Sequence, residues 1–365
     1  MKTSQSFIIK NTGDFCNLRC DYCYLGKDIH DKKRIMDDLV LKKFIKETSE
    51  LYGTVKLYWE GGEPLLAGVN FYQKVVKLQK RYCKHPSQFE NQFQTNGTLI
   101  TQKWIDFSKK NNFKISISFD GYPEMNNLHR KNIAGISSTA AVIHSLKLLN
   151  KANYKPGCII TITRQTATVK NAQKSFHFLI NKLGLKQFSI NFCCDPLNKI
   201  GNKKFTVTNK QFYLFHKTIF DCWVKQGDLQ IKIPFIDDML AGLIGKTPKL
   251  CYYRASCEDM VGIDYTGIVS YCPRLPKDKY QWGDIRNQSL KDILNKNRNR
   301  DLITQTKLFP QKCKTCPWFK ICHNGCLADR YGQENLYYFC KGRMQLFNYL
   351  KKFLTNNIGK AVIKI

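Results

Sequence analysis

One pattern occurs six times in the chain and constrains its fold more than any other feature. Each time, a short β-like run is followed by a stretch with helical periodicity, such as residues 70–81 and 209–225. Alternating βα units favour a parallel sheet with helices outside it, and six of them predict an α/β fold with a partial (β/α)6 barrel. The expected strands are SFIIKN from Ser6, TVKLYWE from Thr54, QFENQFQT from Gln88, FKISISF from Phe113, CIITIT from Cys158 and QFSINFC from Gln187.

Two of these strands have one apolar and one polar face. Apolar side chains alternate with polar ones in the run from Phe113, and again in the run from Gln187. In a parallel barrel the apolar face meets the helices, so the polar side chains point to the lumen or its upper rim. A polar lumen predicts a ligand, and hydrogen bonding within a packed barrel is the alternative. The polar side chains are Ser116, Ser118, Asp120, Ser189, Asn191, Cys193 and Asp195.

The character of the sequence changes near Ile233. Beyond it come strand and turn pieces, a hairpin with a glycine in IDYTGIVSYC, and most of the remaining cysteines. We therefore expect a barrel domain over 1–232, a small cysteine-rich domain over 233–345, and a C-terminal helix or tail over 346–365.

The sixteen cysteines are interpreted through the compartment of the protein. The apolar run in MKTSQSFIIK is too short for a signal peptide, and no later stretch reaches the roughly 18 uninterrupted apolar residues of a membrane span. This predicts a cytoplasmic protein with no membrane partner. Because that compartment is reducing, metal-binding or catalytic thiols are favoured over disulfides.

The chain carries a formal net charge of +31. Such a charge is typical of proteins that bind nucleic acid or an acidic partner, and it suggests an RNA-modifying or RNA-binding protein as one hypothesis. The alternative is a lysine-rich surface of no special function. Iron–sulfur clusters bound to the protein are anionic and would partly offset its charge. The sequence contains no basic stripe interleaved with aromatic residues and no RNA-binding module, so we expect no nucleic-acid partner. An acidic leader peptide would also suit a basic surface.

Cys16, Cys20 and Cys23 lie within eight residues just after the first expected strand, at the end of a barrel where such folds keep their chemistry. Their spacing allows one short loop to ligate three corners of a 4Fe–4S cubane. Zinc would need a fourth protein ligand nearby, and the nearest histidine is His30 in a lysine-rich stretch. Three protein ligands leave one iron open to an external ligand.

The spacing Cys-x3-Cys-x2-Cys, with Tyr22 before the last cysteine, resembles the radical S-adenosylmethionine (SAM) superfamily. The resemblance implies that SAM chelates the open iron and supplies hydrogen abstraction. WEGGEPL, at the end of the second strand, resembles the motif that binds the methionine amino group through backbone groups, since glycine permits a close backbone approach. The matching residues are Gly61, Gly62, Glu63 and Pro64.

Further stretches are similar to the anaerobic sulfatase-maturating enzymes and related peptide maturases. They are QTNGTLI from Gln94, SFDG from Ser118, NNLHRKN from Asn126 and CDPL from Cys194. The resemblance implies that Ser118 and Arg130 contact the methionine carboxylate and ribose region of SAM. A surface salt bridge is the alternative for Arg130.

Eight cysteines lie between Cys251 and Cys340, both included, and their spacing resembles the SPASM extension of radical SAM peptide maturases. The resemblance implies two fully ligated auxiliary 4Fe–4S clusters that move electrons, and therefore three clusters in all; two zinc sites are the alternative. The implied ligand sets are Cys251, Cys257, Cys272 and Cys326 for one cluster and Cys313, Cys316, Cys322 and Cys340 for the other.

The resemblance implies an enzyme that oxidises a peptide or protein side chain and takes electrons from a protein such as flavodoxin or ferredoxin. In sulfatase maturases a catalytic Asp follows the cysteine that matches Cys272, but this chain has Pro273 at that position. The position before the two glycines at the end of the second strand is usually uncharged in those enzymes, but here it is Glu60. We therefore favour cross-link formation in a ribosomally made peptide over formylglycine formation. Asp195 and Glu60 are the candidate proton acceptors, with a turn cap as the alternative for Asp195, and Tyr24 is the candidate substrate contact.

Overall fold

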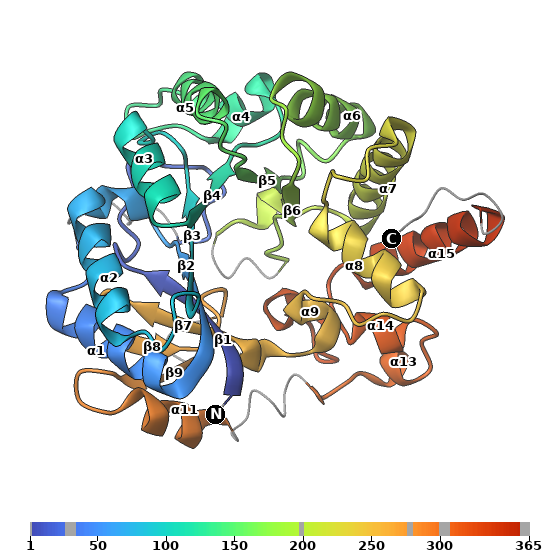
Figure 1. The fold of residues 1–365 in the computed structure, drawn as a ribbon. Helices are drawn as coiled ribbons and strands as arrows, with labels where there is room; N and C mark the ends of the chain where they lie inside the picture. The colour runs from blue at the N-terminus through green and yellow to red at the C-terminus, as the bar shows by residue number, and fades with distance from the viewer. Residues whose placement is uncertain (1, 26–33, 197–200, 276–279, 299–306, 358–365) are drawn as a thin grey trace. The chain divides into compact units, whose positions relative to one another are not determined.

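The computed structural model describes residues 2–25, 34–196, 201–275, 280–298 and 307–357 (Figure 1). The chain divides into two compact units, and each combines part of the predicted barrel with part of the cysteine-rich region. The first unit comprises Met1–Ser118, Asn127–Pro156 and Cys257–Gln305, and the second comprises Phe119–Asn126, Gly157–Ser256 and Thr306–Ile365. The domain limits at 232 and 345 stay a prediction.

Parallel strands form the centre of the first unit, and they confirm the first four expected strands. They are β1 (Lys2–Lys10), β2 (Tyr52–Trp59), β3 (Phe89–Thr95) and β4 (Phe113–Ser118). The predicted hairpin is also present, as β7 (Met260–Asp264) and β8 (Ile268–Ser270), followed by β9 (Gln281–Asp284). The sequence did not predict that β7 pairs with β1 in parallel, so that the strands of this unit lie in the order β4-β3-β2-β1-β7-β8-β9.

Helices cover the apolar face of these strands, as the alternation predicts. Figure 1 shows α1, α2 and α3 side by side along β1 to β4. Beneath them Tyr72 of α2 meets Trp59 and Phe93 edge-on at ring distances of 5.3 and 4.7 Å, so this face is a packed aromatic core. The helices are α1 (Asp38–Leu51), α2 (Val69–Tyr82), α3 (Gln102–Lys110), α5 (Thr139–Lys151) and α11 (Leu290–Arg298), with the short η1 (Pro64–Ala67) and η4 (Cys257–Asp259); α4 (Pro123–His129) runs from the second unit into the first.

The second unit contains the last two expected strands, β5 (Gly157–Ile162) and β6 (Phe188–Phe192), which are paired in parallel. Helix α15 packs along α7: the rings of Phe212 and Phe339 stack at 4.6 Å, and a Cβ on Gly342 would lie 2.5 Å from the Asn209 oxygen. Its helices are α6 (Val169–His177), α7 (Asn209–Gln226), α8 (Pro234–Leu243), α9 (Cys251–Arg254), α13 (Gln311–Lys314), α14 (Phe319–Cys322) and α15 (Cys340–Asn357). Shorter elements are η2 (Phe178–Lys182), η3 (Lys203–Phe205), η5 (Leu327–Asp329), β10 (Arg330–Tyr331) and β11 (Leu336–Tyr337).

Burial follows the predicted alternation of faces in part, since Ser116 in β4 is buried like its apolar neighbours and the side chain at 192 in β6 is half-buried. In β4, Phe113, Ile115 and Ile117 are fully or almost fully buried, whereas Ser118 is half-buried and accepts a hydrogen bond from Gln94 Nε2 at 2.9 Å. In β6 the side chains at 188 and 190 are buried and the one at 191 is exposed. Among the described helices, none is both long enough and apolar enough to cross a bilayer.

Candidate active site

The three-cysteine loop follows β1 directly and lies in the first unit, with Cys16, Cys20 and Cys23 all half-buried. The end of β2 holds the start of this loop. Gly62 donates its N–H to the Gly13 oxygen at 2.9 Å, and Glu63 donates its N–H to the Phe15 oxygen at 2.8 Å. Backbone hydrogen bonds therefore join the end of the second strand to the cysteine loop.

The two glycines of the motif are required by this contact. A Cβ on Gly62 would lie 1.9 Å from the Phe15 oxygen, and one on Gly61 would lie 2.6 Å from the Gly13 oxygen. Gly61 also has φ +110°, a backbone conformation that favours glycine. The sequence predicted a close approach to a ligand, but the structure shows that the cysteine loop itself is the nearest neighbour.

The Glu63 side chain joins the ends of β2 and β3. Its buried carboxylate accepts hydrogen bonds from Leu65 N–H at 3.0 Å, Thr95 Oγ1 at 2.7 Å and Asn96 N–H at 2.7 Å. Burial raises the pKa of Glu63 to about 7, while these three donors lower it. Asn96 in turn donates to Asn17 Oδ1 at 2.8 Å and points its amide at the Cys16 sulfur 3.7 Å away. Asn96 was not predicted as a site residue, although it lies in the QTNGTLI stretch that resembles the family.

The other side of the loop rests on residues 129–132. Arg19 donates its N–H to the Lys131 oxygen at 2.7 Å, and the His129 ring lies edge-on to Tyr22 at 5.5 Å. The Arg130 guanidinium lies over the same Tyr22 ring at 5.7 Å and is only 7% exposed. Arg130 is therefore buried and does not lie at the surface, where the alternative of a salt bridge placed it. The structure brings Tyr22, Arg130 and the cysteines together; the SAM contacts of Ser118 and Arg130 stay predictions.

The three thiols suit an iron–sulfur cluster. Burial and, to a smaller extent, the neighbouring Glu63, Cys20 and Cys23 together raise the pKa of Cys16 to about 12, so the thiols lie within electrostatic range of one another. A bound cationic iron centre would remove this penalty and deprotonate them. Among the described residues, no three Cys, His, Asp or Glu side chains are grouped to hold a single ion. Ligands of a cubane sit on separate iron corners and so stand further apart than the ligands of one ion.

Five residues of the first unit are linked by electrostatic interactions, and we call them the Glu60 cluster: Lys10, Asp14, Tyr24, Glu60 and Arg274. Lys10 is buried, pairs with Asp14 at 3.2 Å and lies over the Tyr24 ring at 5.5 Å. Burial raises the pKa of Glu60, and Lys10 and Arg274 lower it. Burial also raises the pKa of Tyr24 well above its ordinary value, with Glu60 as the largest electrostatic cause, although 43% of the side chain is exposed.

Asp195, in the second unit, forms hydrogen bonds with residues that follow it in the chain. It is buried, its carboxylate accepts a hydrogen bond from Asn202 N–H at 2.9 Å, and its N–H donates to Thr206 Oγ1 at 2.9 Å. This geometry is that of the turn cap considered as the alternative. A role for Asp195 as proton acceptor stays a prediction.

Four of the C-terminal cysteines line one cavity of about 200 Å³ in the second unit: Cys313, Cys316, Cys322 and Cys340. Burial and the other three cysteines together raise the pKa of Cys313 to about 11, in agreement with a shared site. These residues fit a cubane as the first three do. Of the other predicted set, Cys257 and Cys272 belong to the first unit and Cys251 and Cys326 to the second.

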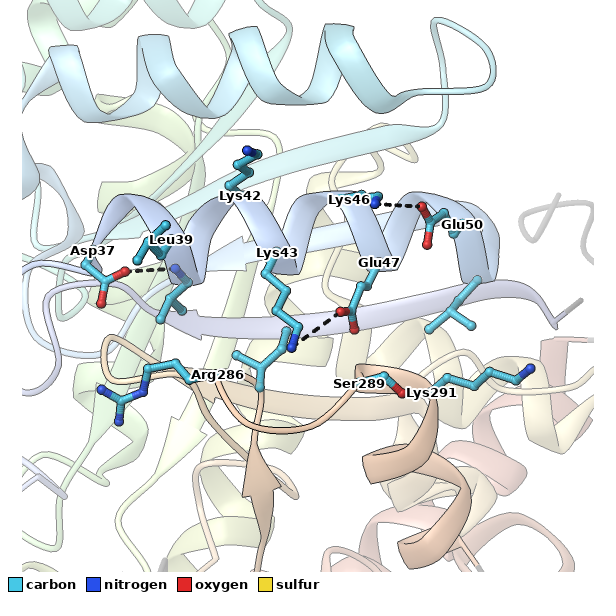
Figure 2. Close-up of a pocket in the computed structure, with 13 residues that line it drawn as sticks. Asp37, Leu39, Lys42, Lys43, Lys46, Glu47, Glu50, Arg286, Ser289 and Lys291 are labelled. Carbon is cyan, nitrogen blue, oxygen red and sulfur yellow. Dashed lines mark hydrogen bonds and ion pairs between the residues drawn. The ribbon is translucent and has the colours of Figure 1, made fainter.

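A groove of about 690 Å³ lies between α1 and the region of α11 (Figure 2). None of the predicted site residues lines it. Several of its charges are paired internally, as Figure 2 shows for Lys43 with Glu47 at 3.8 Å and Lys46 with Glu50 at 3.9 Å. Lys42 and Lys291 also line it.

Comparisons with known proteins agree with this geometry. The family model of the radical SAM superfamily matches residues 10–177, and that of an iron–sulfur cluster-binding domain, SPASM, matches residues 255–317. A cysteine-type anaerobic sulfatase-maturating enzyme of Clostridium perfringens (strain ATCC 13124) is 30% identical over 96% of this chain and 97% of its own length. The chain belongs to the radical SAM–SPASM family that includes these enzymes. A serine-type enzyme of Bacteroides thetaiotaomicron is 29% identical over 98% of this chain and 93% of its own.

A solved structure of a radical SAM–SPASM enzyme, native anSMEcpe with bound AdoMet and Cp18Cys peptide, superposes with a TM-score of 0.88 at 27% identity, over 98% of this chain and 99% of the other. The α/β radical SAM fold with a C-terminal SPASM domain is thereby confirmed. The chain is a radical SAM–SPASM maturase of a peptide or protein, with SAM and iron–sulfur clusters as its cofactors. The number of clusters stays a prediction.

Proposed function

We propose that this maturase oxidatively joins two groups within a peptide substrate and that Glu60 accepts the proton released in that step. The observation that carries the proposal is the Glu60 cluster: a carboxylate whose pKa is raised lies within electrostatic range of Tyr24, while the residue after Cys272 is a proline that cannot accept a proton. A general base works best when its pKa lies near the operating pH. Burial moves Glu60 in that direction, and Lys10 and Arg274 limit the shift.

Cys16, Cys20 and Cys23 would hold the catalytic cluster. Gly61 to Pro64 with Ser118 and Arg130 would hold SAM. When bound, the cluster and SAM supply hydrogen-atom abstraction from carbon. The chain's own residues position the substrate: Tyr24, whose ring is partly exposed above Lys10, is the proposed contact. Holding the reacting carbon in place is the main task of such a site.

The overall step removes two hydrogens from the substrate. One leaves as a hydrogen atom from carbon, and the second leaves as a proton from the attacking sulfur, oxygen or carbon, which Glu60 accepts. A bond forms between the carbon and the attacking atom, and one electron is left over. Accepting that electron is the chemistry that auxiliary clusters supply when bound.

Formylglycine formation is a second candidate, and a specific observation favours it. Full-length identity of 29–30% links this chain to sulfatase-maturating enzymes of both the cysteine type and the serine type. In this version Glu60 takes the proton of a substrate thiol or hydroxyl. Pro273 is the reason that we place it second. No observation in the described residues favours the RNA hypothesis.

The two candidates are separated by their products. The anaerobically reconstituted protein is incubated with SAM, a reductant and either a peptide encoded beside its gene or cysteine- and serine-type sulfatase peptides. A product that has lost two hydrogens and does not react with a carbonyl reagent is a cross-link. A product that reacts with that reagent is formylglycine. Formation of 5′-deoxyadenosine with neither product would contradict both.

We also propose three 4Fe–4S clusters, a flavodoxin or ferredoxin as electron donor, and a cytoplasmic location. Iron analysis tests the first, since three cubanes contain about twelve irons. Replacing each set of cysteines in turn should then lower the iron content by one cluster. Turnover with purified flavodoxin or ferredoxin in place of dithionite tests the second.

A further inference from the structure

Arg343 is a fully buried cation in the second unit. It lies on α15, one turn after Cys340, and is 1% exposed. Aromatic rings surround its guanidinium, with Tyr337 at 4.0 Å and Tyr253 at 4.9 Å from its centre. Tyr252 and Phe235 complete the enclosure at 5.6 and 5.9 Å. Ring faces attract a cation, but they do not neutralise its charge.

The hydrogen bonds of Arg343 lead to the thiol cavity. Nη2 donates to the Tyr337 hydroxyl at 2.7 Å, and Nη1 points at the Cys322 sulfur at 3.6 Å. Within the described ranges, the main electrostatic partners of this guanidinium are Tyr337, Cys322 and Tyr253 and include no carboxylate, and its Nε has no hydrogen-bond partner. An uncompensated buried charge costs several kcal/mol, so a fold that keeps one needs an anion close by.

The cavity that Arg343 lines contains four thiols and supplies that anion. A cubane held by four thiolates carries about two negative charges when oxidised and one more when reduced. Hydrogen bonds to the sulfurs and local charge are among the factors that set the reduction potential of such a cluster. An arginine stays ionised at every working pH, so its field is constant.

We propose that Arg343 is the fixed counter-cation of the cluster held by Cys313, Cys316, Cys322 and Cys340, and that it raises the reduction potential of this cluster. The more negative reduced state gains more from the guanidinium than the oxidised state does. Arg343 is thus a positioning residue that makes this cluster the better electron acceptor. The inference rests on the proposed ligand set, but not on the substrate or on Glu60.

The test uses Arg343→Met, which removes the charge, and Arg343→Lys, which keeps it. Lys341→Met, an exposed lysine on the same helix, is the matched control. All are made in a background in which Cys16, Cys20 and Cys23 are alanine, so that only auxiliary clusters contribute to the spectrum. Iron content shows first whether the clusters are present, and a redox titration followed by electron paramagnetic resonance then gives their potentials.

With Arg343→Met, the potential of one cluster should become more negative, lowering its reduced-to-oxidised ratio at least tenfold at a fixed potential, or about 59 mV for one electron. Arg343→Lys should shift it less, and Lys341→Met not at all. Full iron content with unchanged potentials in Arg343→Met would overturn the proposal.

If Arg343→Met instead loses iron, the thermal unfolding of the metal-free proteins tests the proposal. Metal-free Arg343→Met should unfold at the same temperature as the metal-free parent or higher, because it no longer buries an unpaired charge. A lower temperature would show that the arginine only packs among the tyrosines and would refute the role proposed here.

Discussion

Substituting Gly62 by alanine should remove the catalytic cluster without unfolding the protein. The added Cβ would lie 1.9 Å from the Phe15 oxygen, and Cβ atoms essentially never approach closer than 3.0 Å, so the cysteine loop must move by at least 3.0 − 1.9 = 1.1 Å. That shift would lengthen the 2.8 Å bond from Glu63 N–H to the Phe15 oxygen to about 3.9 Å and break it. Losing a buried hydrogen bond and its packing costs about 2–4 kcal/mol, all of it at the cysteine loop.

Iron content and 5′-deoxyadenosine formation are the assays for Gly62→Ala. We expect iron to fall by one cluster, 5′-deoxyadenosine to fall with it, and the SPASM iron to remain. Gly68→Ala is the control: Gly68 has φ +79° and ψ 159° but nothing within 4 Å of an added Cβ, so it suffers about 1–3 kcal/mol of backbone strain with no push on the loop. Full iron in Gly62→Ala, or equal iron loss in Gly68→Ala, would refute the reasoning.

The remaining predictions concern the second unit and the surface. Burial lowers the pKa of His216 from 6.5 to about 3, so below pH 6.5 the unfolded chain binds a proton that the native state does not, and stability falls by about 2 kcal/mol between pH 6.5 and 5. His216→Phe should flatten this loss in acid-dependent thermal unfolding. Cys313→Ser should lower iron by one cluster while 5′-deoxyadenosine still forms; its complete loss would contradict separate sites. Lys42→Glu with Lys291→Glu should leave product formation unchanged, and a marked loss would assign the groove to the substrate.

The sequence predicted the strands well because their signal is local. Alternation in the runs from Phe113 and Gln187 and the spacing of Cys16, Cys20 and Cys23 can each be seen within a few residues. The pairing of β7 with β1 was not predicted, because Phe7 and Val261 stand about 250 residues apart in the sequence and only the folded chain brings them together.

The supports of the site were harder to predict than its ligands. Nothing in the sequence indicates that the Glu63 carboxylate would hold Asn96 beside Cys16, because that arrangement depends on where two strands end. Arg130 is a similar case, since only its burial against Tyr22 separates a site residue from a surface ion pair. Arg343 gave no sequence signal, because its neighbours Tyr253 and Cys322 come from distant segments.

Glu60→Gln tests the central claim most directly, with Glu90→Gln, an exposed glutamate on β3, as its matched control. In a single turnover with SAM, reductant and peptide, 5′-deoxyadenosine and modified peptide are measured on the same sample. We predict that Glu60→Gln still forms 5′-deoxyadenosine but makes modified peptide about 10²–10⁴-fold more slowly, while Glu90→Gln matches the unmodified protein. Modified peptide formed by Glu60→Gln at the unmodified rate would contradict the account.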